Sequence, residues 1–128
     1  MLVFVYGTLT DTDHVESVVE TFEFVDDAIL SGMHRVDGTY PTVAPGGETK
    51  GRLLETPDTT MLDSYEGVER GLYVRVTVPS EVGEVAVYVG EPGQLGVEDA
   101  VSWPGDGSLE QRVRRYIRKQ NVRIRTAE

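Results

Sequence analysis

Met1-Leu2-Val3-Phe4-Val5-Tyr6-Gly7-Thr8-Leu9 joins an apolar run to a glycine and a threonine. Residues 1–6 have the length and the β-branched and aromatic content that are typical of a buried strand. A strand that stops at a glycine exposes consecutive backbone N–H groups at its end. Such groups form a small concavity that can hold a carboxylate without a charged side chain. The stretch therefore predicts a core strand that ends in an anion-binding loop.

The composition indicates a single globular domain. The chain has 128 residues, of which 39% are hydrophobic and none is cysteine, so we expect one domain over residues 1–128. No apolar run is long enough to span a membrane, and residues 1–6 are too short for a signal peptide. The lack of cysteine excludes thiolate metal sites, and His14 and His34 are far apart in sequence. We therefore expect a soluble cytoplasmic protein with no metal site and no membrane contact.

The charge of the chain is unusual. The formal net charge is −10, and the basic residues are arginines except for Lys50 and Lys119. An acidic, lysine-poor surface suits a cytoplasm of very high salt, where ions screen the self-repulsion of the protein. We interpret this composition as halophilic. It also means that we do not expect a nucleic-acid partner for the main body of the protein.

The basic residues gather near the C-terminal end. Residues 109–128 contain seven basic and two acidic side chains, so this segment carries a charge opposite to that of the remaining chain. One interpretation is a tail that binds an anionic partner such as RNA. We prefer a second interpretation, in which residues 108–128 form a basic helix and tail that lie against an acidic body.

Hydrophobic periodicity and turn residues predict strands mixed with short helices. The clearest element is a hairpin, in which apolar residues alternate over Leu72–Val78 and again over Val85–Val89. Ser108 has the position of an N-cap for a helix that ends at about Gln120. The other expected elements are a helix over 14–20 capped by Asp13, extended segments over 22–33 and 49–56, a short strand over 40–44, a helix from Asp58 through Tyr65, and a loop over 91–107. This order is typical of an α+β domain built on a small mixed β-barrel with a few short helices.

Glu66 is the candidate for proton transfer. In a helix that ends before Gly67 it lies four residues after Leu62, on the face that the leucine turns towards the core. Burial and the negative end of the helix dipole both disfavour a charged carboxylate, and both raise its pKa towards neutrality. Such a carboxyl can take and give a proton near pH 7. The alternative is a solvated glutamate at a helix end, which is the commoner situation for this spacing.

Tyr73 and Arg75 project from one side of the strand that follows Glu66. The tyrosine hydroxyl at this position can hydrogen-bond a substrate or the Glu66 carboxyl, or the ring can simply pack across the sheet. For Arg75 we favour a surface ion pair.

These motifs follow one another in a fixed order: Tyr6-Gly7-Thr8-Leu9, Tyr40-Pro41, Gly51-Arg52-Leu53, Leu62-Asp63-x-x-Glu66-Gly67 and Tyr73-x-Arg75. In this order and spacing, residues 1–90 resemble the γ-glutamylcyclotransferase-like proteins, including the AIG2-like and γ-glutamylamine cyclotransferase branch. The resemblance implies a compact mixed α/β barrel that needs no cofactor. It also implies release of an amine or amino acid from a γ-glutamyl compound, while the glutamyl part cyclises to 5-oxoproline.

The resemblance implies a role for each motif residue. Glu66 corresponds to the family's catalytic glutamate, and Tyr73 to the tyrosine that follows it. The backbone amides of the substrate loop, Tyr6, Gly7, Thr8 and Leu9, would hold the α-carboxylate of the glutamyl group. The nucleophile would be the α-amine of the substrate itself, so Glu66 would move protons and form no covalent bond.

The sequence does not identify the substrate, which is a γ-glutamyl amine, a γ-glutamyl amino acid or a thiol compound such as γ-glutamylcysteine. We expect residues 35–48 to border the pocket and Trp103 to serve as a packing anchor. One alternative function is a module that binds a γ-glutamyl metabolite without turnover, although such a module gains nothing from a second acid in its pocket. Another is a partner-binding or RNA-associated protein that uses the basic C-terminal helix.

Overall fold

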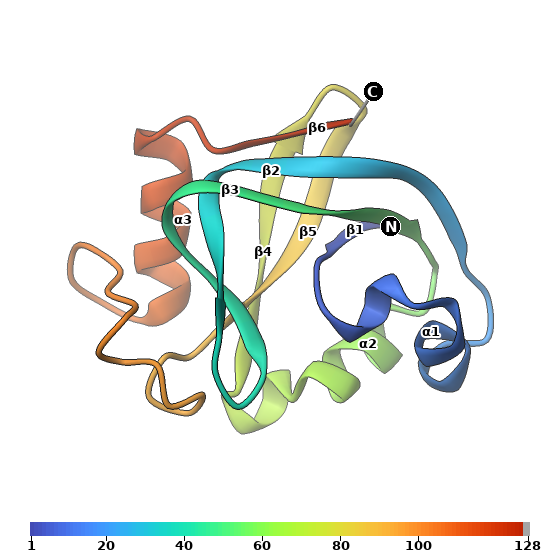
Figure 1. The fold of residues 1–128 in the computed structure, drawn as a ribbon, viewed down its shortest axis with the longest axis horizontal. Helices are drawn as coiled ribbons and strands as arrows, with labels where there is room; N and C mark the ends of the chain where they lie inside the picture. The colour runs from blue at the N-terminus through green and yellow to red at the C-terminus, as the bar shows by residue number, and fades with distance from the viewer. Residues whose placement is uncertain (127–128) are drawn as a thin grey trace.

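The computed structural model of the protein describes residues 1–126, which form a closed β-barrel of six strands with three α-helices around it (Figure 1). This confirms the α+β class and the small mixed barrel predicted from the sequence. The strands are β1 (Leu2–Val5), β2 (Glu23–Asp37), β3 (Pro41–Glu55), β4 (Tyr73–Ser80), β5 (Gly83–Gly90) and β6 (Arg123–Thr126). The α-helices are α1 (Thr12–Val18), α2 (Thr59–Glu66) and α3 (Leu109–Lys119), and the 3₁₀ turns are η1 (Thr8–Thr10) and η2 (Val68–Arg70).

Parallel and antiparallel pairs both contribute to the closure, in the strand order β1-β3-β2-β6-β4-β5. Strand β1 lies between β3, with which it is antiparallel, and β5, with which it is parallel. Its residues Val3, Phe4 and Val5 are almost fully buried, so the apolar run forms the core strand that the sequence predicts. The predicted hairpin is also confirmed, as the antiparallel pair of β4 and β5.

The β2–β3 hairpin is the longest feature of the barrel, because each of its strands has 15 residues. The sequence predicts two separate segments over 40–44 and 49–56, and this prediction is wrong, since β3 runs without a break from Pro41 to Glu55. Pro45 pairs with Met33 where the register shifts. A proline and the glycines after it are tolerated in a strand at such an irregularity, because a ladder hydrogen bond is missing there in any case.

Two helices lie on one side of the barrel and the third on the opposite side. Figure 1 shows α1 and α2 together near the end of β1, with α3 across the barrel from them. The sequence places the first helix over 14–20 with Asp13 as its cap, but α1 starts at Thr12 with Asp11 at the N-cap position. It starts earlier because the turn η1 leads directly into it. Asp58 is at the N-cap of α2, yet its carboxylate accepts hydrogen bonds from the backbone N–H groups of Glu20 and Thr21 and not from its own helix.

The C-terminal segment is part of the barrel. Ser108 is the N-cap of α3, as the sequence predicts, and it forms a capping box with Gln111. Beyond the helix the expected basic tail forms β6, which pairs with β2 and reaches β4 through the Ser80–Ile124 pair. Residues 127–128 of that tail lie outside the described residues. Trp103 is a packing anchor, as predicted: it is 3% exposed and its ring meets Tyr116 edge-on. Among the helices of residues 1–126, none combines the length and apolar content that a bilayer crossing requires.

Candidate active site

A cavity of about 240 Å³ opens where the end of β1, the end of α2 and the first residues of β3 and β4 meet. All six residues that the sequence assigns to a site line this cavity: Tyr6, Gly7, Thr8, Leu9, Glu66 and Tyr73. The other lining residues are Phe4, Val5, Tyr40, Pro41, Tyr65, Arg70, Leu72 and Tyr88. Of the segment 35–48 that was expected to border the pocket, Tyr40 and Pro41 do so.

The cavity has a buried floor and an exposed mouth. Phe4, Tyr6, Tyr73 and Tyr88 are buried and form the inner wall. At the mouth the lining residues Thr8, Tyr40, Tyr65 and Arg70 are exposed, the two tyrosines by 54% and 41% respectively. A ligand would therefore have an enclosed inner part and an outer part that meets aromatic rings and one guanidinium group.

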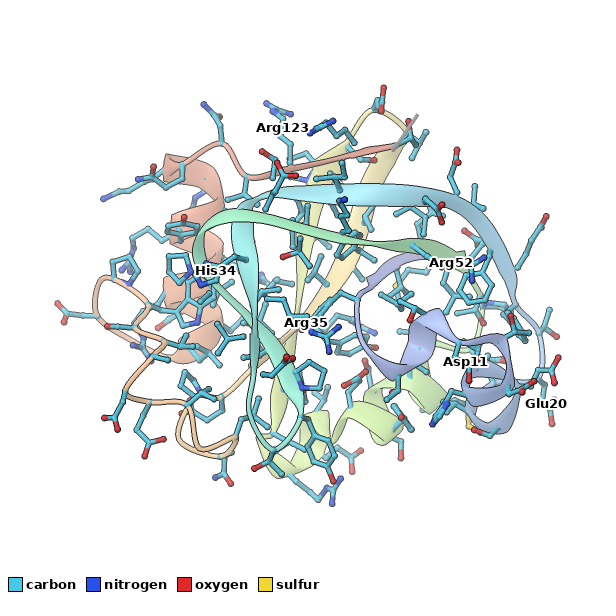
Figure 2. All side chains as sticks on the ribbon, in the orientation of Figure 1. Asp11, Glu20, His34, Arg35, Arg52 and Arg123 are labelled. Carbon is cyan, nitrogen blue, oxygen red and sulfur yellow. The ribbon has the colours of Figure 1, made fainter. Side chains whose placement is uncertain are left out.

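The loop that follows β1 is held from outside the cavity. The Arg35 guanidinium donates to the carbonyl oxygen of Tyr6 at 2.7 Å, and Arg52 donates to that of Thr10 at 3.1 Å. Figure 2 shows Arg35 beside the beginning of this loop and Arg52 near the start of α1. Within residues 1–126, the amide N–H groups of Gly7, Thr8 and Leu9 donate to no other protein group. These three amides are therefore unused by the protein, and their predicted role in binding an anion stays a prediction.

Gly7 is required by space. A β-carbon at this position would lie 2.9 Å from Cγ of Pro41, closer than real side chains approach. Pro41 itself lines the cavity and its carbonyl oxygen accepts the hydroxyl proton of Tyr73. The Gly7–Pro41 contact therefore brings the β1 loop and the start of β3 together on one wall.

Glu66 is the last residue of α2, and the chain turns away at Gly67, which has the left-handed conformation (φ 71°) that favours glycine. Leu62, one turn earlier, is fully buried and anchors this face of the helix. Burial raises the pKa of the Glu66 carboxyl from its ordinary value of 4.5 to about 7. Glu66 is the sole acidic side chain among the described residues that line the cavity. The direction of the shift is the one that the sequence predicts.

The phenol groups of Tyr6 and Tyr73 already use their protons. Tyr6 donates its hydroxyl proton to the carbonyl oxygen of Tyr88 at 2.5 Å, and Tyr73 donates to that of Pro41. Burial raises the pKa of both phenols well above its ordinary value, and the nearby Glu66 adds to each increase. Both groups therefore stay protonated at neutral pH, and their oxygen atoms can accept further hydrogen bonds but cannot donate them. The Tyr6 hydroxyl also interacts with the Thr42 side chain.

Side-chain contacts tie α2 to the barrel beneath it. Asp63 accepts hydrogen bonds from Arg75 at 3.0 and 3.1 Å and from the hydroxyl of Tyr88 at 2.6 Å. The ion pair predicted for Arg75 is present, although it is half-buried and not at the open surface. At the mouth of the cavity, the hydroxyl groups of Thr8 and Tyr65 share a hydrogen bond of 2.9 Å.

Three further residues of the cavity wall were not predicted from the sequence: Tyr65, Arg70 and Tyr88. Tyr88 lies directly opposite Arg75 in the β4–β5 register, so the hairpin alternation could have located it. Tyr65 lies on α2 directly before Glu66, and Arg70 lies in η2, whose direction depends on the left-handed Gly67. No periodic pattern carries that information.

Comparisons with known proteins agree on one family. The sequence matches the family described as "Gamma-glutamyl cyclotransferase, AIG2-like" over residues 3–104. It is 32% identical over 115 residues to AIG2-like protein C of Arabidopsis thaliana, a match that covers 78% of this chain and 67% of that protein. The structure is similar to that of a gamma-glutamyl cyclotransferase, with a TM-score of 0.60 and 19% identity over 93% of this chain and 98% of the other. It is also similar to the solution structure of At5g39720.1 of Arabidopsis thaliana, with a TM-score of 0.56 and 26% identity over 94% and 84% of the two chains.

Proposed function

We propose that this chain converts a small γ-glutamyl compound to 5-oxoproline and a free amine. The premise is that the chain belongs to the gamma-glutamyl cyclotransferase, AIG2-like family. The observation that carries the proposal is the position of Glu66, a partly buried carboxyl with a pKa of about 7 in a cavity shared with free loop amides. A carboxyl of that pKa is suited to exchange protons at neutral pH.

The cavity offers complementary partners for the charged end of a glutamyl group. The amide N–H groups of Gly7, Thr8 and Leu9 would donate to its α-carboxylate. The phenol oxygens of Tyr6 and Tyr73 would accept hydrogen bonds from its α-ammonium group, because their own protons are held by backbone carbonyls. Hydrogen-bond donors would thus bind the α-carboxylate and hydrogen-bond acceptors the α-ammonium group, and together they would orient the glutamyl group in the cavity.

The reaction is an intramolecular acyl transfer. Glu66 as carboxylate removes a proton from the α-ammonium, and the freed amine attacks the γ-carbonyl carbon to form a five-membered ring. After the attack the ring nitrogen still carries one surplus proton. As the bond from the carbonyl carbon to the leaving nitrogen breaks, Glu66 returns the first proton to that nitrogen. Glu66 then passes the surplus proton of the ring nitrogen to the same amine, which leaves as an ammonium ion. The products are 5-oxoproline and the free amine, so atoms and protons balance without a cofactor. Holding the glutamyl chain folded supplies the proximity that such a step requires.

Developing charge on the carbonyl oxygen needs hydrogen-bond donors. The hydroxyl protons of Tyr6 and Tyr73 are not available for this, because both are donated to backbone carbonyl oxygens. One of the three loop amides, with the other two on the α-carboxylate, is then the better candidate for this role. One well-placed donor lowers the barrier by about 3 kcal/mol.

The test is release of 5-oxoproline from a panel of γ-glutamyl amines, amino acids and thiol compounds, measured at several salt concentrations. Glu66→Gln keeps the size of the side chain and removes its proton exchange, so we expect turnover to fall about 1000-fold with the fold intact. Glu69→Gln is the matched control, since Glu69 is exposed, lies outside the cavity and loses the same charge. Near-native turnover by Glu66→Gln would refute the assignment. Tight binding of these compounds by the wild-type protein without any product would instead support a non-catalytic binding module.

A further inference from the structure

Arg70 differs from the other arginines near the cavity. Arg35 is bound to Asp37 and the Tyr6 carbonyl, and Arg75 is bound to Asp63. None of the ion pairs or side-chain hydrogen bonds found within residues 1–126 involves the Arg70 side chain, and this side chain is exposed. It is also the one cationic side chain among the described residues that line the cavity. In a chain of net charge −10, an uncommitted cation at a cavity mouth stands out.

The position of Arg70 is defined by the turn after the helix. Its guanidinium packs over Gly67, because a β-carbon built there would lie 2.9 Å from Nη2 and 3.3 Å from Nε of Arg70. The side chain thus folds back beside the end of α2 and stays at the mouth. The pKa of Glu66 is raised by burial, with no lowering from a nearby cation, so the guanidinium is not paired with that carboxyl. It is available to a ligand.

We propose that Arg70 selects the leaving group, by binding a carboxylate that the departing amine carries next to its nitrogen. The inference rests on the proposed cyclotransferase function, in which the glutamyl part fills the inner cavity and the leaving group extends to the mouth. There it would meet Arg70 together with the exposed rings of Tyr40 and Tyr65. The substrate class is then a γ-glutamyl amino acid, whose α-carboxylate pairs with the guanidinium and whose side chain contacts the aromatic rings.

The positive charge of Arg70 disfavours γ-glutamyl substrates with other leaving groups. An uncharged leaving amine loses the charge-assisted contact, and a leaving group with a second ammonium group is repelled. Because Arg70 is exposed, the pair is screened by salt, and its contribution is smaller than that of a buried pair.

The experiment compares two substrates that differ by one carboxylate, γ-glutamylalanine and γ-glutamylethylamide. We expect the wild-type kcat/KM to be about tenfold higher for γ-glutamylalanine at low salt. In Arg70→Gln this ratio should fall to about 1, and in Arg70→Glu it should invert. Arg118→Gln is the matched control, because Arg118 is an exposed arginine on α3 and its loss changes the net charge equally. This control should keep the wild-type ratio.

The outcomes separate the two proposals. If Arg70→Gln lowers kcat/KM equally for both substrates, the arginine holds the glutamyl group common to them and the inference is overturned. An unchanged ratio in Arg70→Gln, with turnover intact, also overturns it and leaves the cyclotransferase function standing. If the wild-type protein releases 5-oxoproline from neither compound, the proposed function fails. Calorimetric binding of the two compounds to wild type and Arg70→Gln then decides the inference, which requires a carboxylate-dependent affinity that the variant loses.

Discussion

Tyr88 donates a hydrogen bond of 2.6 Å to Asp63, one helical turn before Glu66. Tyr88 belongs to β5 and lines the cavity, and its carbonyl oxygen accepts the hydroxyl proton of Tyr6. Asp63 is bound from β4 as well, through Arg75. The end of α2 is therefore fixed to two barrel strands by a single carboxylate. We expect the orientation of Glu66 over the cavity to depend on this attachment.

Asp63→Asn should reduce kcat about tenfold while the protein stays folded. The amide still accepts from Tyr88, but Arg75 loses its charge partner, and we expect the free energy of unfolding to fall by about 1–2 kcal/mol. The measurement is kcat against pH, together with urea unfolding. A displaced Glu66 would shift the acid limb of the profile away from about pH 7. If only stability changes and kcat and the profile do not, Asp63 has no role in positioning Glu66.

Glu66 should make the protein less stable as the pH rises. Its pKa is about 7 in the folded state against 4.5 ordinarily, so the folded state binds the proton more tightly. Stability is therefore lost between about pH 4.5 and pH 7 and is constant above that range. We expect Glu66→Gln to be more stable than wild type by about 2 kcal/mol at pH 8 and equally stable at pH 4, because the amide carries no charge at either pH. Urea unfolding at both pH values checks this, and an equal stability at pH 8 would contradict the burial of the carboxyl.

Gly7→Ala should weaken substrate binding. The added methyl group would meet Pro41 at 2.9 Å, which pushes the β1 loop and the start of β3 apart. We expect KM to rise about tenfold and the free energy of unfolding to fall by about 1 kcal/mol. Gly93→Ala is a suitable control, because there the nearest atom is the end of the flexible Glu91 side chain at 3.3 Å. The expectation is wrong if both variants have the KM of the wild type.

The basic C-terminal segment should matter for the barrel and not for turnover. Ile124 of β6 is 2% exposed, so Ile124→Ala should lower the free energy of unfolding by about 2–4 kcal/mol. Replacing the exposed Arg118, Lys119 and Arg123 together by glutamine should leave kcat/KM unchanged. Loss of turnover in this triple variant would support the partner-binding interpretation of the segment. Deleting the segment is a poorer test, because it removes a barrel strand.

The parts of the fold that local chemistry determines were predictable. Gly67 ends α2, Ser108 begins α3, and apolar alternation marks the β4–β5 hairpin, because each signal acts within a few residues. The site residues Tyr6 to Leu9 and Glu66 were found through their motifs, and the structure brings them to one cavity. Their catalytic and binding roles stay predictions.

The parts that depend on distant contacts were not predictable. Pro45 and the glycines after it read as a break, yet pairing with β2 carries β3 through them. The short β6 reads as a basic tail, since its place between β2 and β4 is set by the barrel and not by its own sequence. Expectations about the cytoplasm and about high salt concern the surroundings of the protein and stay predictions too.

The turn η2 is flanked by two left-handed glycines, Gly67 at φ 71° and Gly71 at φ 74°, and its backbone hydrogen bonds stay within residues 63–72. Proton exchange would depend on Glu66, just before this turn. The choice of γ-glutamyl substrate would depend on Arg70, at the end of the turn. The exposed positions 69 and 70 can thus be randomised in a library while the glycines preserve the backbone. Redesign towards a new donor would begin there, with the barrel left as it is.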